Sequence, residues 1–233
     1  MAEDLEIEAI VPAYNEGSTV ATVVQVIATH PHIKKVVVVD DGSSDKTAQN
    51  IRDMIVQDSL QDKVKLIEQK NSGKTKAIEV GFGATISPLI LMLDSDLIGL
   101  THEHITELIN PVLEGKVVMT IGLFKSGRFI TDLAHRTNPN LSGQRVMKRE
   151  CLEAVDWQKT KNFGLESHLT DLIKTKKWYI QWINLKGMTH RMKTEKRGFW
   201  HGWISRFQMY KQIFINDISR QTGWSTWFRK KKN

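Results

Sequence analysis

The sequence predicts an α/β fold with a Rossmann-like, doubly wound and mostly parallel sheet. Apolar runs rich in β-branched residues alternate with segments of helical period through the first half of the chain. Several runs are apolar without interruption, such as the four valines at 36–39, which is typical of strands buried on both faces. With 233 residues, the chain is long enough to bury such a core.

Five short strands are expected in the first half, and each of the first four is followed by an expected helix. Strands are expected at residues 6–11, where Pro12 ends the run, and at 36–39, 64–67, 89–93 and 116–122. Apolar stripes predict helices at 20–27, 48–55, 74–84 and 105–113. Ser43 or Ser44 is expected to cap the second helix and Thr101 the fourth, which Pro111 should kink.

The pattern is looser after residue 123. A loop is expected at 125–140, a helix at 165–173 and a strand at 178–185. Apolar residues then recur at helical spacing from Trp200 to Ile218, which predicts a C-terminal amphipathic helix. We therefore expect a main domain at residues 1–197, followed by an amphipathic helix and a basic, tryptophan-rich tail at 198–233.

The net charge of +7 is unevenly distributed along the chain. Residues 186–233 contain 12 Lys or Arg and 2 Asp or Glu, so the other 185 residues carry a net charge of −3. A mildly acidic body with a basic end argues against a nucleic-acid-binding protein. The segment 224–232 is expected to touch an anionic membrane surface. For the helix before it, packing on the domain or a homodimer contact is favoured, and contact with the membrane is the alternative.

No targeting or membrane-spanning segment is expected. The N-terminus is acidic and lacks the apolar run of a signal peptide, and no stretch of about 18 apolar residues occurs. The single cysteine, Cys151, excludes internal disulfides and fits a reducing compartment, where a buried structural thiol is expected. We expect a cytoplasmic location, with the inner face of the membrane as the surface that the tail would meet.

Three polar segments directly follow three of the expected strands, at residues 12–16, 40–44 and 94–96. Ligands of doubly wound sheets bind at the carboxyl ends of the strands, so we expect the three segments to converge at one edge. Asp94 and Asp96 are separated by one residue and offer the hard oxygen ligands that Mg²⁺ or Mn²⁺ prefers. A cation held there would stabilise the charge that develops on a diphosphate leaving group. On its own, such a triplet is also common in solvated loops.

The segments Pro12–Glu16, Val39–Asp45 and Leu93–Asp96, in this order, resemble family 2-like glycosyltransferases with the GT-A fold. The resemblance covers residues 6–122, which would form the nucleotide-sugar half, with an acceptor half at 123–197. It implies that Asp41 accepts the N–H of a uracil-like base, although an Asx-type turn is the alternative for this residue. The residues implied in donor binding are Pro12, Tyr14, Glu16, Asp41, Lys74, Asp94 and Ser95, and those implied in metal binding are Asp94 and Asp96.

Four short segments of the second half resemble retaining glucosyl-3-phosphoglycerate synthases: residues 126–131, 141–145, 162–166 and 188–191. This resemblance implies that Arg128 and Thr131 face the acceptor, that Glu166 contacts the donor sugar and that His190 is the third metal ligand. An imidazole is a suitable partner for Mn²⁺. In an inverting enzyme, Glu166 or Asp171 would instead be the general base. An unliganded surface histidine is the alternative for His190.

The segment Asn71–Thr75 looks like the end of a phosphate-binding P-loop, but that motif requires a glycine where this chain has Glu68. A P-loop nucleotide hydrolase is therefore excluded. The resemblance to glycosyltransferases places the segment before a helix that lines the donor site. Lys74 or Lys76 would then meet the diphosphate, and a solvated pair of lysines is the alternative.

The sequence thus predicts a metal-dependent hexosyltransferase, with Asp96, Glu166, Arg128 and Thr131 as its catalytic residues. UDP-glucose is the favoured donor, with GDP-mannose as an alternative, and the acceptor is a hydroxyl of a small phosphorylated or lipid-linked molecule. A sugar-phosphate nucleotidyltransferase is less favoured, because that chemistry needs a glycine-rich loop where this chain has Pro12–Asn15. A non-catalytic nucleotide- or lipid-binding module is the remaining alternative.

Overall fold

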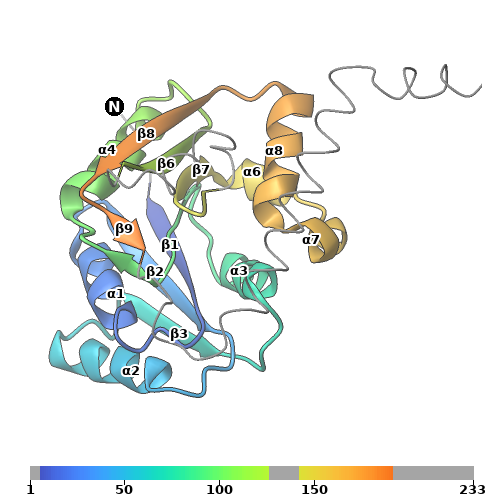
Figure 1. Ribbon diagram of the computed structural model, residues 1–233. Helices are drawn as coiled ribbons and strands as arrows, with labels where there is room; N and C mark the ends of the chain where they lie inside the picture. Colours follow the sequence, from blue (N-terminus) through green and yellow to red (C-terminus); the bar gives the residue numbers. More distant parts are fainter. Residues whose placement is uncertain (1–5, 126–141, 191–233) are drawn as a thin grey trace, which may run out of the picture. The chain divides into compact units, whose positions relative to one another are not determined.

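Figure 1 shows the computed structural model, which describes residues 6–125 and 142–190. All of these residues belong to one compact unit, residues 1–191. The expected amphipathic helix and basic tail lie outside the described residues, as do Arg128 and Thr131. The domain boundary at residue 197 therefore stays a prediction.

A seven-stranded mixed sheet forms the centre of this unit, with the strand order β3-β2-β1-β4-β7-β6-β8. Its neighbours pair in parallel, except that β7 runs antiparallel to both β4 and β6. The predicted α/β class with a mostly parallel sheet is confirmed. The strands are β1 (Ile7–Ala13), β2 (Ile33–Asp40), β3 (Val64–Glu68), β4 (Leu89–Met92), β6 (Met119–Lys125), β7 (Arg145–Lys148) and β8 (Ile180–Lys186).

Helices cover both faces of the sheet (Figure 1). One face packs against α1 (Val20–Thr29), α2 (Thr47–Gln57) and α4 (His102–Leu113). The other face packs against α3 (Lys74–Gly83), α6 (Arg149–Glu153), α7 (Trp157–Phe163) and α8 (Leu165–Lys176). The fold is therefore a three-layer sandwich, as expected for a doubly wound sheet.

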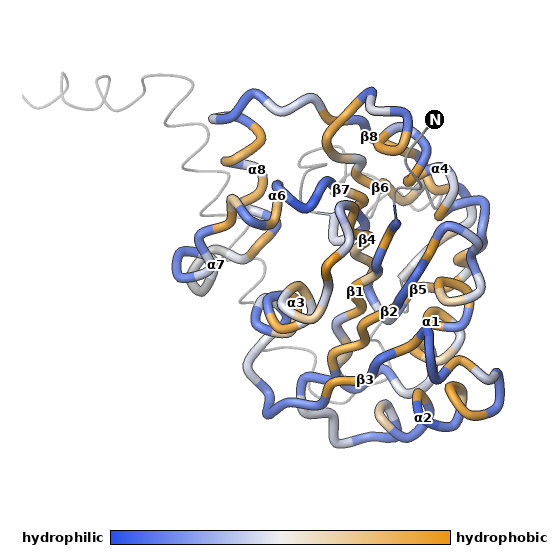
Figure 2. The backbone as a smooth tube through the Cα atoms, turned by 180° about the vertical axis from the view of Figure 1, so that it is seen from behind, coloured by the Kyte–Doolittle hydropathy of each residue, from blue (hydrophilic) through white to orange (hydrophobic). Residues whose placement is uncertain are grey.

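Successive residues of the central strands enter different cores. In β1, Ala9 and Val11 join the core beneath α1, whereas Ile10 joins the core beneath α8. All four residues from Val36 to Val39 are completely buried, which explains why this strand is apolar without interruption. Figure 2 shows the same pattern as hydrophobic strands surrounded by hydrophilic turns.

Several element boundaries differ from those that the sequence predicts. Strand β1 continues through Pro12 to Ala13, because the ladder with β4 ends at Ile10 and only β2 pairs beyond it. Neither Ser43 nor Ser44 caps α2, which begins at Thr47 after the N-cap residue Lys46. The capping of α4 by Thr101 is confirmed, and this helix continues through Pro111 to Leu113.

Strand β7 and a second, two-stranded sheet are absent from the sequence-based prediction. The small sheet pairs β5 (Leu97–Ile98) with β9 (Thr189–His190) in antiparallel orientation. Both β5 and β9 have two residues, too few for hydrophobic alternation to be recognised. This small sheet places the two residues that follow the Asp94–Asp96 turn beside Thr189 and His190, at the end of the described chain.

Candidate active site

The three polar segments meet at the carboxyl ends of β1, β2 and β4. The backbone N–H of Asn15 donates to Oγ of Ser43 at 2.8 Å, and the N–H of Ser44 donates to Oδ1 of Asn15 at 2.8 Å. The hydroxyl of Thr19 donates to the backbone carbonyl of Ser95 at 2.9 Å. The first two hydrogen bonds join the segment 12–16 to the segment 40–44. The third joins Thr19, which follows the segment 12–16, to the segment 94–96.

Asp40 and Asp41 have different surroundings at the end of β2. Asp40 accepts hydrogen bonds from the backbone N–H and the hydroxyl of Ser43, which closes the local turn. Asp41 accepts from the backbone N–H groups of Ser72 and Gly73, each at 2.8 Å, and from the Gln69 side chain at 2.7 Å. Asp40 thus makes a local turn, whereas Asp41 holds the loop that leads into α3.

Gly42 allows that loop to lie close to the end of β2. Its φ of +74° is in the left-handed region that favours glycine. A Cβ atom at this position would lie 2.6 Å from the backbone nitrogen of Asn71. The Asp41-Gly42 pair therefore fixes the path of the chain up to Lys74, the first residue of α3.

Lys74 lies between two carboxylates that are far apart in the sequence. Its Nζ atom is 2.7 Å from Oδ1 of Asp94 and 3.1 Å from Oε1 of Glu166. The side chains of Asp94 and Glu166 are 19% and 20% exposed, against 44% for Lys74, so the carboxylates lie deeper than the ammonium. The structure thereby brings together three residues that the sequence implicates in donor binding, one of them from the second half.

The charges in this cluster shift one another's pKa values. Burial lowers the pKa of Lys74, but the two carboxylates outweigh it and raise the pKa above its ordinary value. Burial raises the pKa of Glu166, but Lys74, the backbone N–H of Glu166 and Arg145 together hold it below its ordinary value. Glu166 also lies in the first turn of α8, where the helix dipole favours a negative charge. Lys74 and Glu166 are therefore both charged at neutral pH.

The segment Ser142–Arg145 supports this cluster from within the fold. Gln144 is completely buried and makes two hydrogen bonds with Asp94. Arg145 is also completely buried, donates from Nε to the carbonyl of Ser142 at 2.9 Å, and has its pKa lowered by burial to about 10. The sequence analysis assigns no role to Gln144 itself, although this residue lies in the segment 141–145 that resembles retaining glucosyl-3-phosphoglycerate synthases.

The Asp94–Asp96 turn leads directly into the small sheet. The Cα partner of Leu97 in this sheet is His190, which places the backbone of His190 beside the turn. Ser95 is buried, and its carbonyl is held by Thr19 as described above. Among the described side chains, no three His, Cys, Asp or Glu residues form a group that could hold a metal ion.

The remaining implicated residues of the first segment lie at the same edge. Pro12 is buried within β1, and Glu16 is 8% exposed, with its carbonyl accepting from the N–H groups of Thr19 and Val20 at the start of α1. Tyr14 is 48% exposed. Among these three residues, only the tyrosine presents much of its surface to an incoming ligand.

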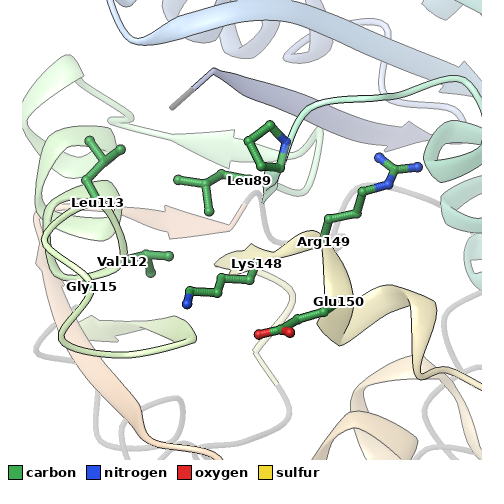
Figure 3. A pocket seen from close by; sticks show the side chains of 8 residues that line it. Leu89, Val112, Leu113, Gly115, Lys148, Arg149 and Glu150 are labelled. Atoms are coloured by element: carbon green, nitrogen blue, oxygen red, sulfur yellow. The ribbon is translucent and has the colours of Figure 1, made fainter. Parts of the chain in front are cut away.

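A separate hollow of about 460 Å³ lies away from these residues (Figure 3). It is lined at the start of β4 by Pro88 and Leu89, and Asp94 follows the other end of that strand. Of the implicated residues that the structure describes, none lines this hollow. It is therefore not part of the cluster around Lys74.

None of the helices in the described part of the chain is long and apolar enough to cross a lipid bilayer. The thiol of Cys151 is buried, and burial raises its pKa to about 12. An inert structural thiol fits both observations.

Comparison with solved structures gives the same fold. Glucosyl-3-phosphoglycerate synthase from Mycobacterium tuberculosis, in complex with Mn²⁺, UDP-glucose and glycerol 3-phosphate, superimposes with a TM-score of 0.67 at 21% identity. The match covers 92% of this chain and 79% of that one. The complex of the same enzyme with Mg²⁺ and UDP gives a TM-score of 0.68 at 20% identity, with the same coverage.

Two curated proteins are similar over part of their length. A dodecaprenyl-phosphate galacturonate synthase of Rhizobium johnstonii is 33% identical over 100 residues, which is 41% of this chain and 29% of that protein. An undecaprenyl-phosphate 4-deoxy-4-formamido-L-arabinose transferase of Pectobacterium carotovorum is 27% identical over 143 residues, 59% of this chain and 43% of that protein. The chain thus spans less than half the length of either relative.

The sequence profile of Glycosyl transferase family 2 matches residues 8–214, which includes all three strand-end segments, the Lys74 cluster and His190. This match extends over most of the chain and agrees with the GT-A-type fold. The protein belongs to glycosyltransferase family 2 and is a glycosyltransferase.

Proposed function

We propose that this protein transfers a hexose from a UDP-sugar, UDP-glucose in the first instance, to a small phosphorylated or lipid-linked acceptor in a metal-dependent reaction. The observation that carries the proposal is the cluster of Lys74, Asp94 and Glu166 beside the Asp94–Asp96 turn. Two carboxyl side chains and an ammonium offer both acceptors and donors to a ligand with many hydroxyl groups. A sugar is such a ligand.

The nucleotide would lie over the ends of β1 and β2. In this arrangement Tyr14 and Pro12 line the pocket of the base, and Asp41 accepts the base N–H. Asp41 already orders the loop before α3 through two backbone hydrogen bonds. One carboxylate would thus hold both the base and the loop that carries Lys74 to the diphosphate and the sugar.

We propose that Asp96 and His190 would hold a divalent cation near the turn. Asp94 shares Lys74 with Glu166, the residue implied to contact the sugar, so we assign Asp94 to the sugar rather than to the metal. A carboxylate and an imidazole, completed by diphosphate oxygens and water, form a suitable ligand set for Mn²⁺, and Mg²⁺ is the alternative. When bound, the cation would neutralise the negative charge that develops on the leaving diphosphate.

Glu166 fits a sugar-binding role better than that of a general base. A base is most efficient when its pKa lies near the working pH, and the pKa of Glu166 lies below the ordinary value for a glutamate. The ionised carboxylate beside Lys74 is well placed to accept a hydrogen bond from a sugar hydroxyl. This role agrees with the retaining stereochemistry that the sequence resemblance implies.

The acceptor is proposed to carry a phosphate group. The structurally similar synthase was solved with glycerol 3-phosphate, and the two curated relatives are named for polyprenyl-phosphate substrates. We propose that Arg128 and Thr131 bind the acceptor. A lipid-linked acceptor would also give a reason for the basic tail at 198–233 to meet the inner face of the membrane.

A donor screen tests the proposal. The full chain is incubated with UDP-glucose, UDP-galactose, UDP-N-acetylglucosamine or GDP-mannose, with Mn²⁺ or with EDTA, and released nucleotide and sugar are measured by mass spectrometry. We expect slow release from UDP-glucose that requires Mn²⁺. With 3-phosphoglycerate, glycerol 3-phosphate or a short polyprenyl phosphate added, sugar should appear on one of them. Metal-independent release, or release from GDP-mannose alone, would contradict the proposal.

A further inference from the structure

Gln144 makes two hydrogen bonds with Asp94. Its Nε2 atom donates to Oδ2 of Asp94 at 3.0 Å, and the backbone N–H of Asp94 donates to its Oε1 atom at 3.2 Å. Because a glutamine side chain has one acceptor oxygen and one donor nitrogen, this pairing fixes which way the amide faces. The carboxylate of Asp94 is therefore held from one side by Gln144 and from the other by Lys74.

Gln144 has little freedom to move away from this position. The residue is completely buried, its carbonyl accepts from the backbone N–H of Gly122 at 2.8 Å, and its own N–H donates to Oγ of Ser142. It directly precedes β7, whose antiparallel pairing with β4 aligns Arg145 with Met92. Gln144 is thus carried by the middle of the sheet and not by a surface loop.

Gly143, the preceding residue, leaves room for the ends of both charged side chains. A Cβ atom at this position would lie 2.9 Å from both carboxylate oxygens of Asp94 and 2.9 Å from Nζ of Lys74. All three atoms are the ends of side chains, so an alanine would displace them without requiring a change in the backbone. Gly143 and Gln144 together therefore determine where the Asp94 carboxylate lies.

We propose that Gln144, assisted by the absence of a side chain at Gly143, is a positioning residue that orients the Asp94 carboxylate toward the donor sugar. This inference rests on the function proposed above, in which Asp94 binds the sugar and Asp96 serves the metal. Gln144 acts only through Asp94. Its loss should weaken recognition of the sugar without weakening recognition of the nucleotide.

The test compares the affinities for UDP-glucose and UDP, each measured by calorimetry with Mn²⁺ in the full chain. We expect Gln144→Leu to weaken UDP-glucose binding about tenfold, the effect of losing a hydrogen bond to a charged group, while UDP binding changes less than twofold. Gly143→Ala should act in the same direction through displacement of the carboxylate. The matched control is Thr120→Val on the neighbouring strand β6, which removes a buried hydrogen bond to the carbonyl of Leu108 in α4.

A double-mutant cycle with Asp94→Asn separates positioning from general damage to the fold. If Gln144 acts through Asp94, Gln144→Leu should have less than a twofold effect on UDP-glucose binding in the Asp94→Asn background. Equal losses for UDP and UDP-glucose, or full additivity in the cycle, would overturn the inference. If Gln144→Leu does not fold, Gly143→Ala provides the same two readouts.

The binding measurements distinguish a failure of the proposed function from a failure of the role of Gln144. A wild-type protein that binds neither UDP nor UDP-glucose would contradict the function itself. A wild-type protein that prefers UDP-glucose to UDP, with the same preference in Gln144→Leu and Gly143→Ala, would contradict only the role of Gln144.

Discussion

The first region of the molecule, residues 6–125, and the second region, residues 142–190, build the candidate site in different ways. In the first region, turns that follow parallel strands place several neighbouring residues at the site, as the Asp94–Asp96 turn does. In the second region, single side chains reach the site from separate elements: Gln144 before β7 and Glu166 on α8. In the proposed donor site, the first region would provide the framework and the second would add single side chains to it.

This difference predicts which binding step a substitution in each region should affect. Changes in the turns of the first region should affect binding of the nucleotide and the metal. Changes in the second region should affect recognition of the sugar.

Asp96→Ala should reduce turnover about a thousandfold or more, because it removes the carboxylate proposed to hold the metal at the developing diphosphate charge. The measurement is the Mn²⁺-dependent rate of sugar release or transfer, with circular dichroism to verify folding. Asp53→Ala is the control, since Asp53 is an exposed residue of α2 that accepts a hydrogen bond from the side chain of Gln49. Retention of metal-dependent transfer by Asp96→Ala would remove the metal role from this residue.

Lys74→Met should reduce kcat/KM about a hundredfold, because the two carboxylates lose the ammonium between them and the donor loses a cationic partner. Lys76→Met is the matched control on the same helix, since Lys76 pairs with Glu79 on the surface. We expect the control to remain within twofold of the wild type. Equal effects of the two substitutions would mean that the site depends on the net charge of α3 and not on the position of Lys74.

A pH effect on stability should arise in the first region, away from the site. His30 is buried beside His102 and His32, and burial, followed by these two histidines and Lys63, lowers its pKa to about 4. Between pH 6.5 and 4 the unfolded chain therefore binds a proton at this residue that the folded chain does not. The resulting stability is present above pH 6.5 and is lost as the pH falls toward 4.

The free energy of unfolding should accordingly fall by about 2 kcal/mol between pH 7 and pH 5 because of His30. Denaturant titrations at several pH values measure this, and His30→Gln should flatten the dependence. An unchanged slope in His30→Gln would assign the effect to other groups. UDP binding by this variant at pH 7 should equal that of the wild type, because His30 lies at the end of α1 and not at the edge that carries the site.

The sequence predicts the first region well because its strands are buried on both faces and its turns follow them directly. The valines at 36–39 and the Asp94–Asp96 turn illustrate this, since local pattern and final position coincide. Strand β7 could not be found in this way, because its four residues, Arg145–Lys148, begin with a buried arginine and gain their strand pairing from distant neighbours. Gln144 was missed for the same reason: its role depends on a contact 50 residues away in sequence.

The implied sugar contact of Glu166 is the sequence-based expectation that depends most on tertiary structure. Nothing local to α8 connects this residue with Lys74 or Asp94, which precede it by 92 and 72 residues in the sequence. The structure places Glu166 in an ion pair with Lys74. Its chemical role stays a prediction.

The most direct test of a donor site built from both regions is calorimetry of Glu166→Gln with UDP and with UDP-glucose in the presence of Mn²⁺. The variant keeps the size of the side chain but removes its charge, and the exposed Glu153 of α6 provides the matched control Glu153→Gln. The account predicts that UDP binds Glu166→Gln with the wild-type affinity, while the additional affinity for UDP-glucose is lost. Unchanged preference for UDP-glucose over UDP in this variant would contradict it.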